Sequence, residues 1–137
     1  MKPKVSILLG SYNQKDYIRQ ALESALNQTY PNLEIIAFDD GSTDGTADIL
    51  RSYAGDKRVK LVFTKENISQ ARIGILAFSH CAGEFISGLC GDDYYLPDKI
   101  QRQMECFESL PADYGVVYSP VYRLNVVTGE RWLSPCP

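Results

Sequence analysis

Two pairs of neighbouring carboxylates are the residues of this sequence best suited to chemistry. Asp39-Asp40 directly follows the apolar run 33–38, and Asp92-Asp93 follows a second apolar run at 84–89. Each pair falls where a buried strand is expected to end, and the carboxyl ends of strands in an open parallel α/β sheet border the ligand crevice. Carboxylates brought into one crevice repel each other unless a positive charge is present. The two positions therefore predict a binding site that uses a cation or a positive side chain.

Asp92-Asp93 offers the oxygen ligands that a hard divalent cation accepts, Mg²⁺ or Mn²⁺. Neighbouring residues point in different directions, so one carboxylate is available for the metal and the other for a sugar hydroxyl. The sequence contains neither G-x-G-x-x-G nor G-x-x-x-x-G-K-[ST], so a phosphate-bearing ligand needs the metal for neutralisation. The simpler interpretation is an Asp-Asp pair in a surface turn, where aspartate is common.

Asp39-Asp40 opens the stretch D-D-G-S-T-D-G-T at 39–46. One carboxylate at this depth is placed to accept the ring N–H of a nucleobase, and its neighbour to accept ribose hydroxyls or to orient the loop. The alternative is ordinary turn chemistry, with Ser42 or Asp44 capping the next helix.

Two further side chains are expected near the same edge. Tyr12 follows the first expected strand, and its ring is suited to stacking on a base. Arg72 lies on the helix before the fourth strand, within reach of a base, a phosphate or Asp40. A rim tyrosine and a solvated helix arginine are the alternatives for these two residues.

The apolar pattern predicts alternating strands and helices. Strands are expected at 5–9, 34–38, 59–64, 84–89 and 114–118, and helices from Asp16, near Thr46, over 69–81 and from Pro97 to before Pro111. Residues 122–126 alternate weakly, and Thr128-Gly129 suits a hairpin turn. This order predicts an α/β fold, a three-layer αβα sandwich with a mostly parallel sheet and right-handed crossovers. We expect one domain over 1–137.

Composition narrows the class of protein. The chain of 137 residues has a net charge of -3, which gives no support for nucleic-acid binding. No apolar stretch approaches the roughly 20 residues that span a bilayer, and the run after Lys4 is too short for a signal peptide. We therefore expect a cytoplasmic protein, with peripheral attachment to the inner face of a membrane left open. The four cysteines lack zinc-site spacing, and the single histidine, His80, is expected to be structural.

The motifs, in this order and spacing, resemble family-2 glycosyltransferases with the GT-A fold, a Rossmann-like nucleotide-diphospho-sugar transferase fold. The resemblance covers about 4–119. It is carried by V-S-I with S-Y-N at 5–13, A-L-N-Q-T-Y-P-N-L-E-I-I at 25–36, D-D-G-S-T-D-G-T at 39–46, G-E-F-I at 83–86, and Asp92-Asp93 with Leu96-Pro97.

The resemblance implies transfer of a sugar from a nucleotide-sugar, commonly a UDP-sugar, to an acceptor hydroxyl on a saccharide or lipid-linked saccharide. It implies that Gly10, Ser11, Tyr12 and Asp40 hold the nucleoside with help from Arg72. It further implies that Asp92 contacts the ribose or the diphosphate and that Asp93 coordinates a divalent cation, Mn²⁺ or Mg²⁺. The metal would act as a Lewis acid on the leaving diphosphate.

Three residues depart from the family pattern. Gly10 replaces a common proline, Cys90 stands where an acidic residue is frequent, and Ile73 replaces the usual asparagine after Arg72. Family members usually continue well past this length, and their later half supplies the acceptor site and the general base of inverting transfer. We expect this chain to be a truncated, donor-binding half. None of the acidic residues after Asp98 matches a base motif.

Two other functions are alternatives for this chain. A non-catalytic nucleotide-binding module is compatible with the missing acceptor half. A phosphoacceptor signalling domain needs a lysine after the last strand, and the segment 117–120 has none. The apolar segment 114–127, without the family's later half to cover it, predicts self-association.

Overall fold

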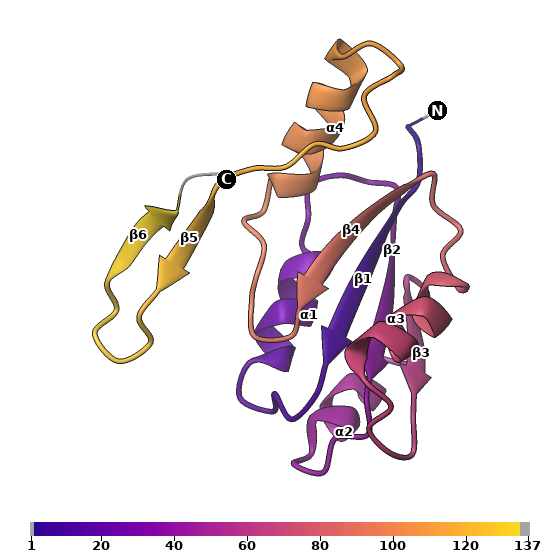
Figure 1. The fold of residues 1–137 in the computed structure, drawn as a ribbon, viewed down its shortest axis with the longest axis vertical. Coiled ribbons are helices and arrows are strands. Elements are labelled where there is room, and N and C mark those ends of the chain that lie inside the picture. Colours follow the sequence, from indigo (N-terminus) through magenta and orange to yellow (C-terminus); the bar gives the residue numbers. More distant parts are fainter. Residues whose placement is uncertain (1, 135–137) are drawn as a thin grey trace. The chain divides into compact units, whose positions relative to one another are not determined.

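The structure, a computed structural model, describes residues 2–134 and divides into two compact units, Met1–Ile100 and Gln101–Pro137. The first unit contains a sheet of four parallel strands in the order β3-β2-β1-β4 (Figure 1). Its strands are β1 (Val5–Ser11), β2 (Leu33–Asp39), β3 (Val59–Phe63) and β4 (Phe85–Cys90). The predicted α/β class with a mostly parallel sheet is confirmed.

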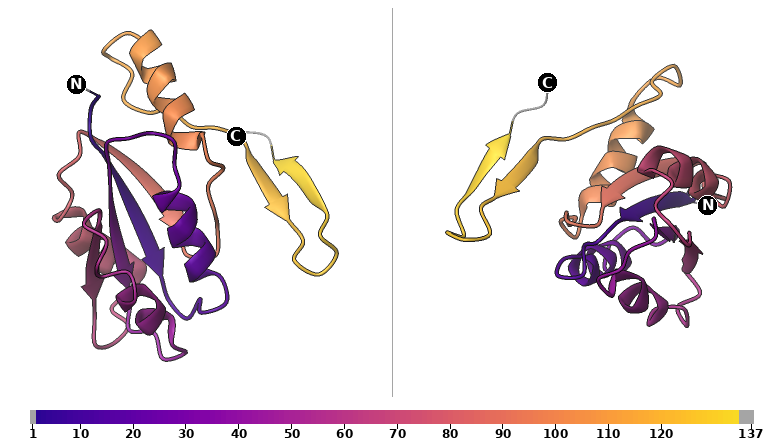
Figure 2. Two further views of the ribbon diagram at one scale, coloured as in Figure 1. Left: turned by 180° about the vertical axis from the view of Figure 1, so that it is seen from behind. Right: turned by 60° about the horizontal axis from the view of Figure 1, so that its bottom comes forward.

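Three helices cover this sheet in two layers. α1 (Ile18–Leu26) and α2 (Thr46–Arg51) lie on one face, and α3 (Gln70–Phe78) lies on the other (Figure 2). Helix α1 buries residues spaced at i, i+3, i+4 and i+7, namely Ile18, Ala21, Leu22 and Ala25. The helices begin and end within a few residues of the expected positions.

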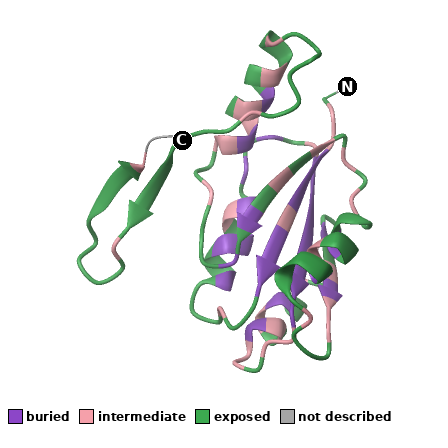
Figure 3. Cartoon of the chain, in the orientation of Figure 1, coloured by how far each residue is buried: buried purple, intermediate pink, exposed green. Residues whose placement is uncertain are grey.

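The core is concentrated on the two middle strands, β1 and β2 (Figure 3). All seven residues of β2 are buried, as expected for a parallel strand covered on both faces. On one face of β2, Ile36 and Phe38 pack with Ile73 and Ala77 of α3. The outer strand β4 alternates between partly covered and exposed residues. Helix α3 packs on β1 and β2, so the face of β4 on that side is left uncovered.

The second unit holds most of α4 (Lys99–Ser109), followed by β5 (Val121–Leu124) and β6 (Arg131–Ser134). β5 and β6 form an antiparallel hairpin, and Gly129 in its loop has φ +74°. The expected turn at Thr128-Gly129 is therefore confirmed.

The expected strand at 114–118 is wrong. These residues form no strand, and most of their side chains are exposed. The physical reason is the lack of a partner, because a strand needs a neighbour that completes its ladder of hydrogen bonds. Within the described residues of this unit, β5 pairs with β6 and no strand pairs with 114–118.

Of the four cysteines, Cys136 lies outside the described residues.

Candidate functional site

The strand register brings both acidic pairs to the carboxyl edge of the sheet. Asp39 lies opposite Ser11 of β1, and on the other side of β1 Cys90 lies opposite Gly10. The loops that carry Asp39-Asp40 and Asp92-Asp93 thus leave the same edge, with β1 between them. Two strand spacings amount to about 10 Å.

Asp39 is buried and holds the carboxyl edge of the sheet together through hydrogen bonds. Its carboxylate accepts hydrogen bonds from the Ser11 hydroxyl at 3.0 Å and from the Ser42 backbone N–H at 3.0 Å. The Ser42 hydroxyl also donates to it at 2.5 Å. All these partners belong to the protein, so Asp39 fixes the ends of β1 and β2 and the start of the following loop.

The loop after β2 is hydrogen-bonded to the loop after β1. The backbone N–H groups of Asn13, Gln14 and Lys15 donate to the side chains of Ser42, Thr46 and Asp44 at 2.8, 2.9 and 3.0 Å. Asp44 also accepts from Thr46, and these hydrogen bonds lower the pKa of its carboxyl group although partial burial acts in the opposite direction. The polar residues of the D-D-G-S-T-D-G-T stretch therefore make the β1 loop rigid.

The carboxylate of Asp40 has different hydrogen-bond partners from that of Asp39. One carboxylate oxygen accepts from the Ile68 N–H at 2.9 Å and from the Thr64 hydroxyl at 3.2 Å. The other oxygen, Oδ2, is buried and has no hydrogen-bond partner among residues 2–134. Buried polar groups are usually paired, so Oδ2 is an acceptor that a bound molecule could use. The residue is 0% exposed, because the segment 64–68 covers it.

The segment 64–68, which covers Asp40, packs closely against the backbone at Gly41. Gly41 has φ +73°, and a Cβ at this position would lie 2.6 Å from the backbone carbon of Glu66. At the far end of the segment Ser69 has φ +84°, a conformation that non-glycine residues rarely adopt. Glycine at 41 is therefore required by both backbone conformation and space.

The acidic turn, residues 90–93, follows β4. The Asp93 N–H donates to the Cys90 carbonyl at 3.0 Å, and the Gly91 N–H donates to the Gly10 carbonyl at 2.8 Å. A Cβ at Gly91 would lie 2.4 Å from Oε1 of Gln14, a buried oxygen with no hydrogen-bond partner in the part of the chain that the structure describes. The close contact between Gly91 and β1 fixes the backbone of the turn, and with it the directions in which the Cys90 and Asp92 side chains leave the backbone.

Three potential metal ligands converge on this turn. One ligand atom each from Cys90, Asp92 and Asp93 lies within 4.8 Å of the others, and all three residues are exposed. Although the residues are exposed overall, partial desolvation of the carboxyl group and the neighbouring charge of Asp92 raise the pKa of Asp93. Partial desolvation and the charges of Asp93 and Asp92 likewise raise the pKa of the Cys90 thiol. A divalent cation would relieve this repulsion, and the two carboxylates are ligands of the kind that Mn²⁺ and Mg²⁺ accept.

The remaining predicted nucleoside-binding residues differ in their availability. Tyr12 is 40% exposed beside the edge, as a stacking residue requires. Gly10 is buried and lies against the ring of Phe38, and the Ser11 side chain is engaged with Asp39. Arg72 is exposed on α3 and has no described contact with Asp40.

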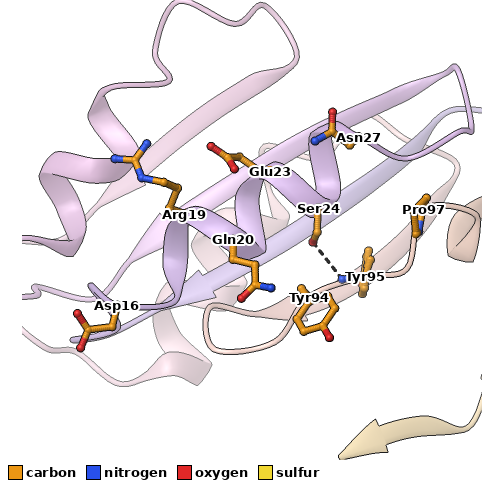
Figure 4. Close-up of a pocket in the computed structure, with 9 residues that line it drawn as sticks. All are labelled: Asp16, Arg19, Gln20, Glu23, Ser24, Asn27, Tyr94, Tyr95 and Pro97. Atoms are coloured by element: carbon orange, nitrogen blue, oxygen red, sulfur yellow. Dashed lines mark hydrogen bonds between the residues drawn. The ribbon is translucent and has the colours of Figure 1, made fainter. Parts of the chain in front are cut away.

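Two hollows lie in the first unit. One, of about 450 Å³, lies between α1 and the segment after the acidic turn (Figure 4). There the Tyr95 N–H donates to the Ser24 hydroxyl at 3.0 Å. The second, of about 440 Å³, lies beside the loop after β2 and is lined in part by Asp39, Arg51 and Lys65. Neither hollow is lined by Asp40 or Asp93.

Sequence reasoning missed several supporting residues. Thr64 and the Ile68 amide hold Asp40, and Gln14 borders the acidic turn. For Thr64, the sequence offered one indication, because the residue directly follows an expected strand and so lies at the carboxyl edge of the sheet. The contacts of Ile68 and Gln14 depend on how two loops close, which no local pattern encodes.

The family model of glycosyl transferase family 2 matches residues 6–135. The chain belongs to this family. Among curated family members, the Escherichia coli UDP-Glc:alpha-D-GlcNAc-diphosphoundecaprenol beta-1,3-glucosyltransferase WfaP is 39% identical over 127 residues, covering 91% of this chain and 49% of its own length. The chain thus spans less than half of the curated relatives it matches.

Solved structures of glycosyltransferases agree with the GT-A fold. S. aureus TarS 1-349 in complex with UDP matches with a TM-score of 0.70 and 26% identity, over 77% of this chain and 32% of that one. The mannosyltransferase PcManGT from Pyrobaculum calidifontis, in complex with GDP-Man and Mn²⁺, matches with a TM-score of 0.64 and 28% identity, over 69% and 29%. Within residues 2–134, no helix has the length and apolar character needed to cross a membrane.

Proposed function

We propose that this chain is the donor-binding part of a metal-dependent, inverting glycosyltransferase that uses a UDP-sugar. The observation that carries the proposal is the placement of two carboxylate groups at one sheet edge, on either side of β1. A nucleoside diphosphate has a base at one end and a phosphate-bound cation at the other. Its two ends match a buried hydrogen-bond acceptor and a cluster of metal ligands.

Asp40 is the proposed acceptor for the uracil ring N–H. Its orphaned Oδ2 supplies the acceptor, while Thr64 and Ile68 hold the other oxygen. Because the residue is fully covered, the base reaches Oδ2 only when the segment 64–68 shifts outward. The exposed ring of Tyr12 then stacks on the base, and the backbone at Gly10 and Ser11 forms the floor.

The acidic turn is the proposed diphosphate end of the site. Asp93 holds the divalent cation, and Asp92 contacts the ribose or the diphosphate. The cation supplies Lewis-acid stabilisation to the leaving diphosphate when it is bound. Support comes from the crowding of carboxylates at the turn and from the Mn²⁺ named in the PcManGT complex. Arg72, exposed and near the start of α3, is proposed to assist at the nucleotide.

Titration calorimetry with UDP, with and without Mn²⁺, tests this function. The proposal predicts UDP binding that strengthens when Mn²⁺ is present and that loses the Mn²⁺ dependence in Asp93→Asn. Absence of UDP binding in both conditions, for a chain that remains folded by circular dichroism, would contradict it.

A non-catalytic nucleotide-binding module is the second candidate. It needs only the nucleotide contacts proposed for Asp40 and the acidic turn, and no group that takes the acceptor's proton. We assign no general base to the described residues. A turnover assay with UDP-sugars separates the two candidates, because a binding module binds UDP without transferring sugar.

The glycosyltransferase proposal also includes a cytoplasmic location and a saccharide or lipid-linked saccharide as the acceptor.

A further inference from the structure

Cys90 gives the acidic turn a ligand of a different chemical class from its neighbours. The thiol lies with one oxygen each of Asp92 and Asp93 in a group whose atoms are all within 4.8 Å of one another. Ligands of one metal ion sit about 2.0–2.3 Å from it, so two of them are separated by at most about 4.5 Å. Small side-chain rotations therefore bring all three donors to one ion.

The backbone of the turn favours this convergence. The Asp93 N–H donates to the Cys90 carbonyl, which folds the first and last residues of the turn toward each other. Gly91 is hydrogen-bonded to Gly10 and has no room for a side chain. Beside Gly91 lies Oε1 of Gln14, an oxygen to which no residue of 2–134 donates a hydrogen bond. The three donors are thus held on a turn fixed from behind.

We propose that Cys90 is a third protein ligand of the divalent cation and shifts the preference of the site toward thiophilic metals. This inference rests on the proposed function of Asp93. Carboxylates alone suit Mg²⁺ and Mn²⁺, whereas a thiolate added to them favours Zn²⁺, Cd²⁺ and Co²⁺. Coordination replaces the S–H bond by a metal–sulfur bond, and the thiol proton passes to solvent.

The test uses metal ions alone, without nucleotide, on the whole chain. In the parent protein for this test the other cysteines are replaced (C81A, C106S, C136S), so that any sulfur signal comes from Cys90. The inference predicts a thiolate-to-metal charge-transfer band on addition of Co²⁺, and loss of that band in Cys90→Ser. Because Cys90 is exposed, this substitution leaves the fold intact.

Calorimetry supplies the second readout. We expect Cys90→Ser to weaken Cd²⁺ binding by about tenfold or more, since even outer-shell partners change metal affinity by about 10- to 100-fold. Mg²⁺ affinity should stay unchanged in Cys90→Ser and increase in Cys90→Asp, which restores the acidic residue frequent in the family. Equal Cd²⁺ affinity and equal Co²⁺ spectra in the parent and Cys90→Ser would overturn the inference.

The two proposals fail in different ways. If Asp93→Asn abolishes Mn²⁺ binding while Cys90→Ser changes no metal, the proposed donor site stands and the role of Cys90 is refuted. If Asp93→Asn leaves Mn²⁺ binding intact, the metal site itself is refuted, and the inference about Cys90 is refuted with it.

Discussion

Glu34 is the residue whose charge the fold most clearly depends on. It is buried on β2 and accepts hydrogen bonds from the Ser6 hydroxyl at 2.6 Å and from the Ala82 N–H. Lys60 forms an ion pair with it at 3.0 Å. Burial alone would raise the pKa of Glu34, but these partners outweigh it and lower the pKa to about 2. The carboxylate thereby joins β1, β2, β3 and the segment before β4.

This geometry predicts an acid-sensitive stability. The folded-state pKa lies below the unfolded value, so the stabilisation is complete above about pH 5 and is lost as the pH falls toward 2. The shift corresponds to a free energy on the order of 3 kcal/mol. Urea unfolding at several pH values should show that Glu34→Gln is less stable at pH 7 and less sensitive to acid. The exposed Glu84→Gln is the control, and an equal acid dependence in both variants would contradict the role of Glu34.

Gly10 explains one departure from the family pattern at the same scale. A Cβ at this position would lie 2.6 Å from the Phe38 ring, so the aromatic ring occupies the space that a larger residue would fill. The sequence shows that the usual proline is absent. It does not show that Phe38, on the neighbouring strand, is the compensating residue, because that contact depends on the β1–β2 register.

At the scale of elements, the strands and helices of the first unit were largely predictable. The stripe of α1 and the apolar runs of β1 and β2 are local signals, and the acidic pairs mark where β2 and β4 end. The strand expected at 114–118 failed because apolar composition does not reveal whether a partner strand exists. Likewise, the cover over Asp40 was not predictable, since it comes from closure of the segment 64–68.

The acidic turn permits a matched test of how it is seated. Gly91→Ala places a Cβ 2.4 Å from Oε1 of Gln14 and 3.0 Å from the Gly10 carbonyl oxygen, so the Gln14 side chain must move and the contact between the turn and β1 becomes tighter. We expect a loss of about 1–3 kcal/mol in the free energy of unfolding, as for other overpacked sites, together with weaker Mn²⁺ binding. Gly88→Ala, on β4 with nothing within 4 Å, should affect neither quantity by a comparable amount. Equal effects of the two alanines, measured by denaturation and calorimetry, would refute this account of the turn.

At the scale of the whole molecule, the second unit exposes an unusual amount of apolar surface. The residues concerned are Tyr114, Val116, Tyr118, Val121, Tyr122, Leu124, Val126, Val127, Trp132 and Leu133, and Val127 is 91% exposed. A two-stranded hairpin is marginally stable by itself. Such a surface is typical of a segment that other protein surface covers.

We therefore propose that the chain self-associates through this segment. Sedimentation velocity over a range of concentrations should show an average mass that increases with concentration. Replacing Val127 and Trp132 by serine should reduce this increase, whereas replacing the exposed Thr128 by serine should not. A monomer at all concentrations would contradict the proposal.

We propose that Asp40 recognises the base while Asp93 holds the cation at the other end of the same nucleotide, and the relative affinity for UDP and CDP in Mn²⁺ is the decisive measurement. Uracil presents an N–H donor at the ring position where cytosine presents an acceptor. We predict that the unaltered chain prefers UDP, and that Asp40→Asn, whose amide can donate to cytosine, lowers this preference by about tenfold. Asp93→Asn should weaken both nucleotides and leave their ratio unchanged. An unchanged UDP-to-CDP ratio in Asp40→Asn would contradict the claim.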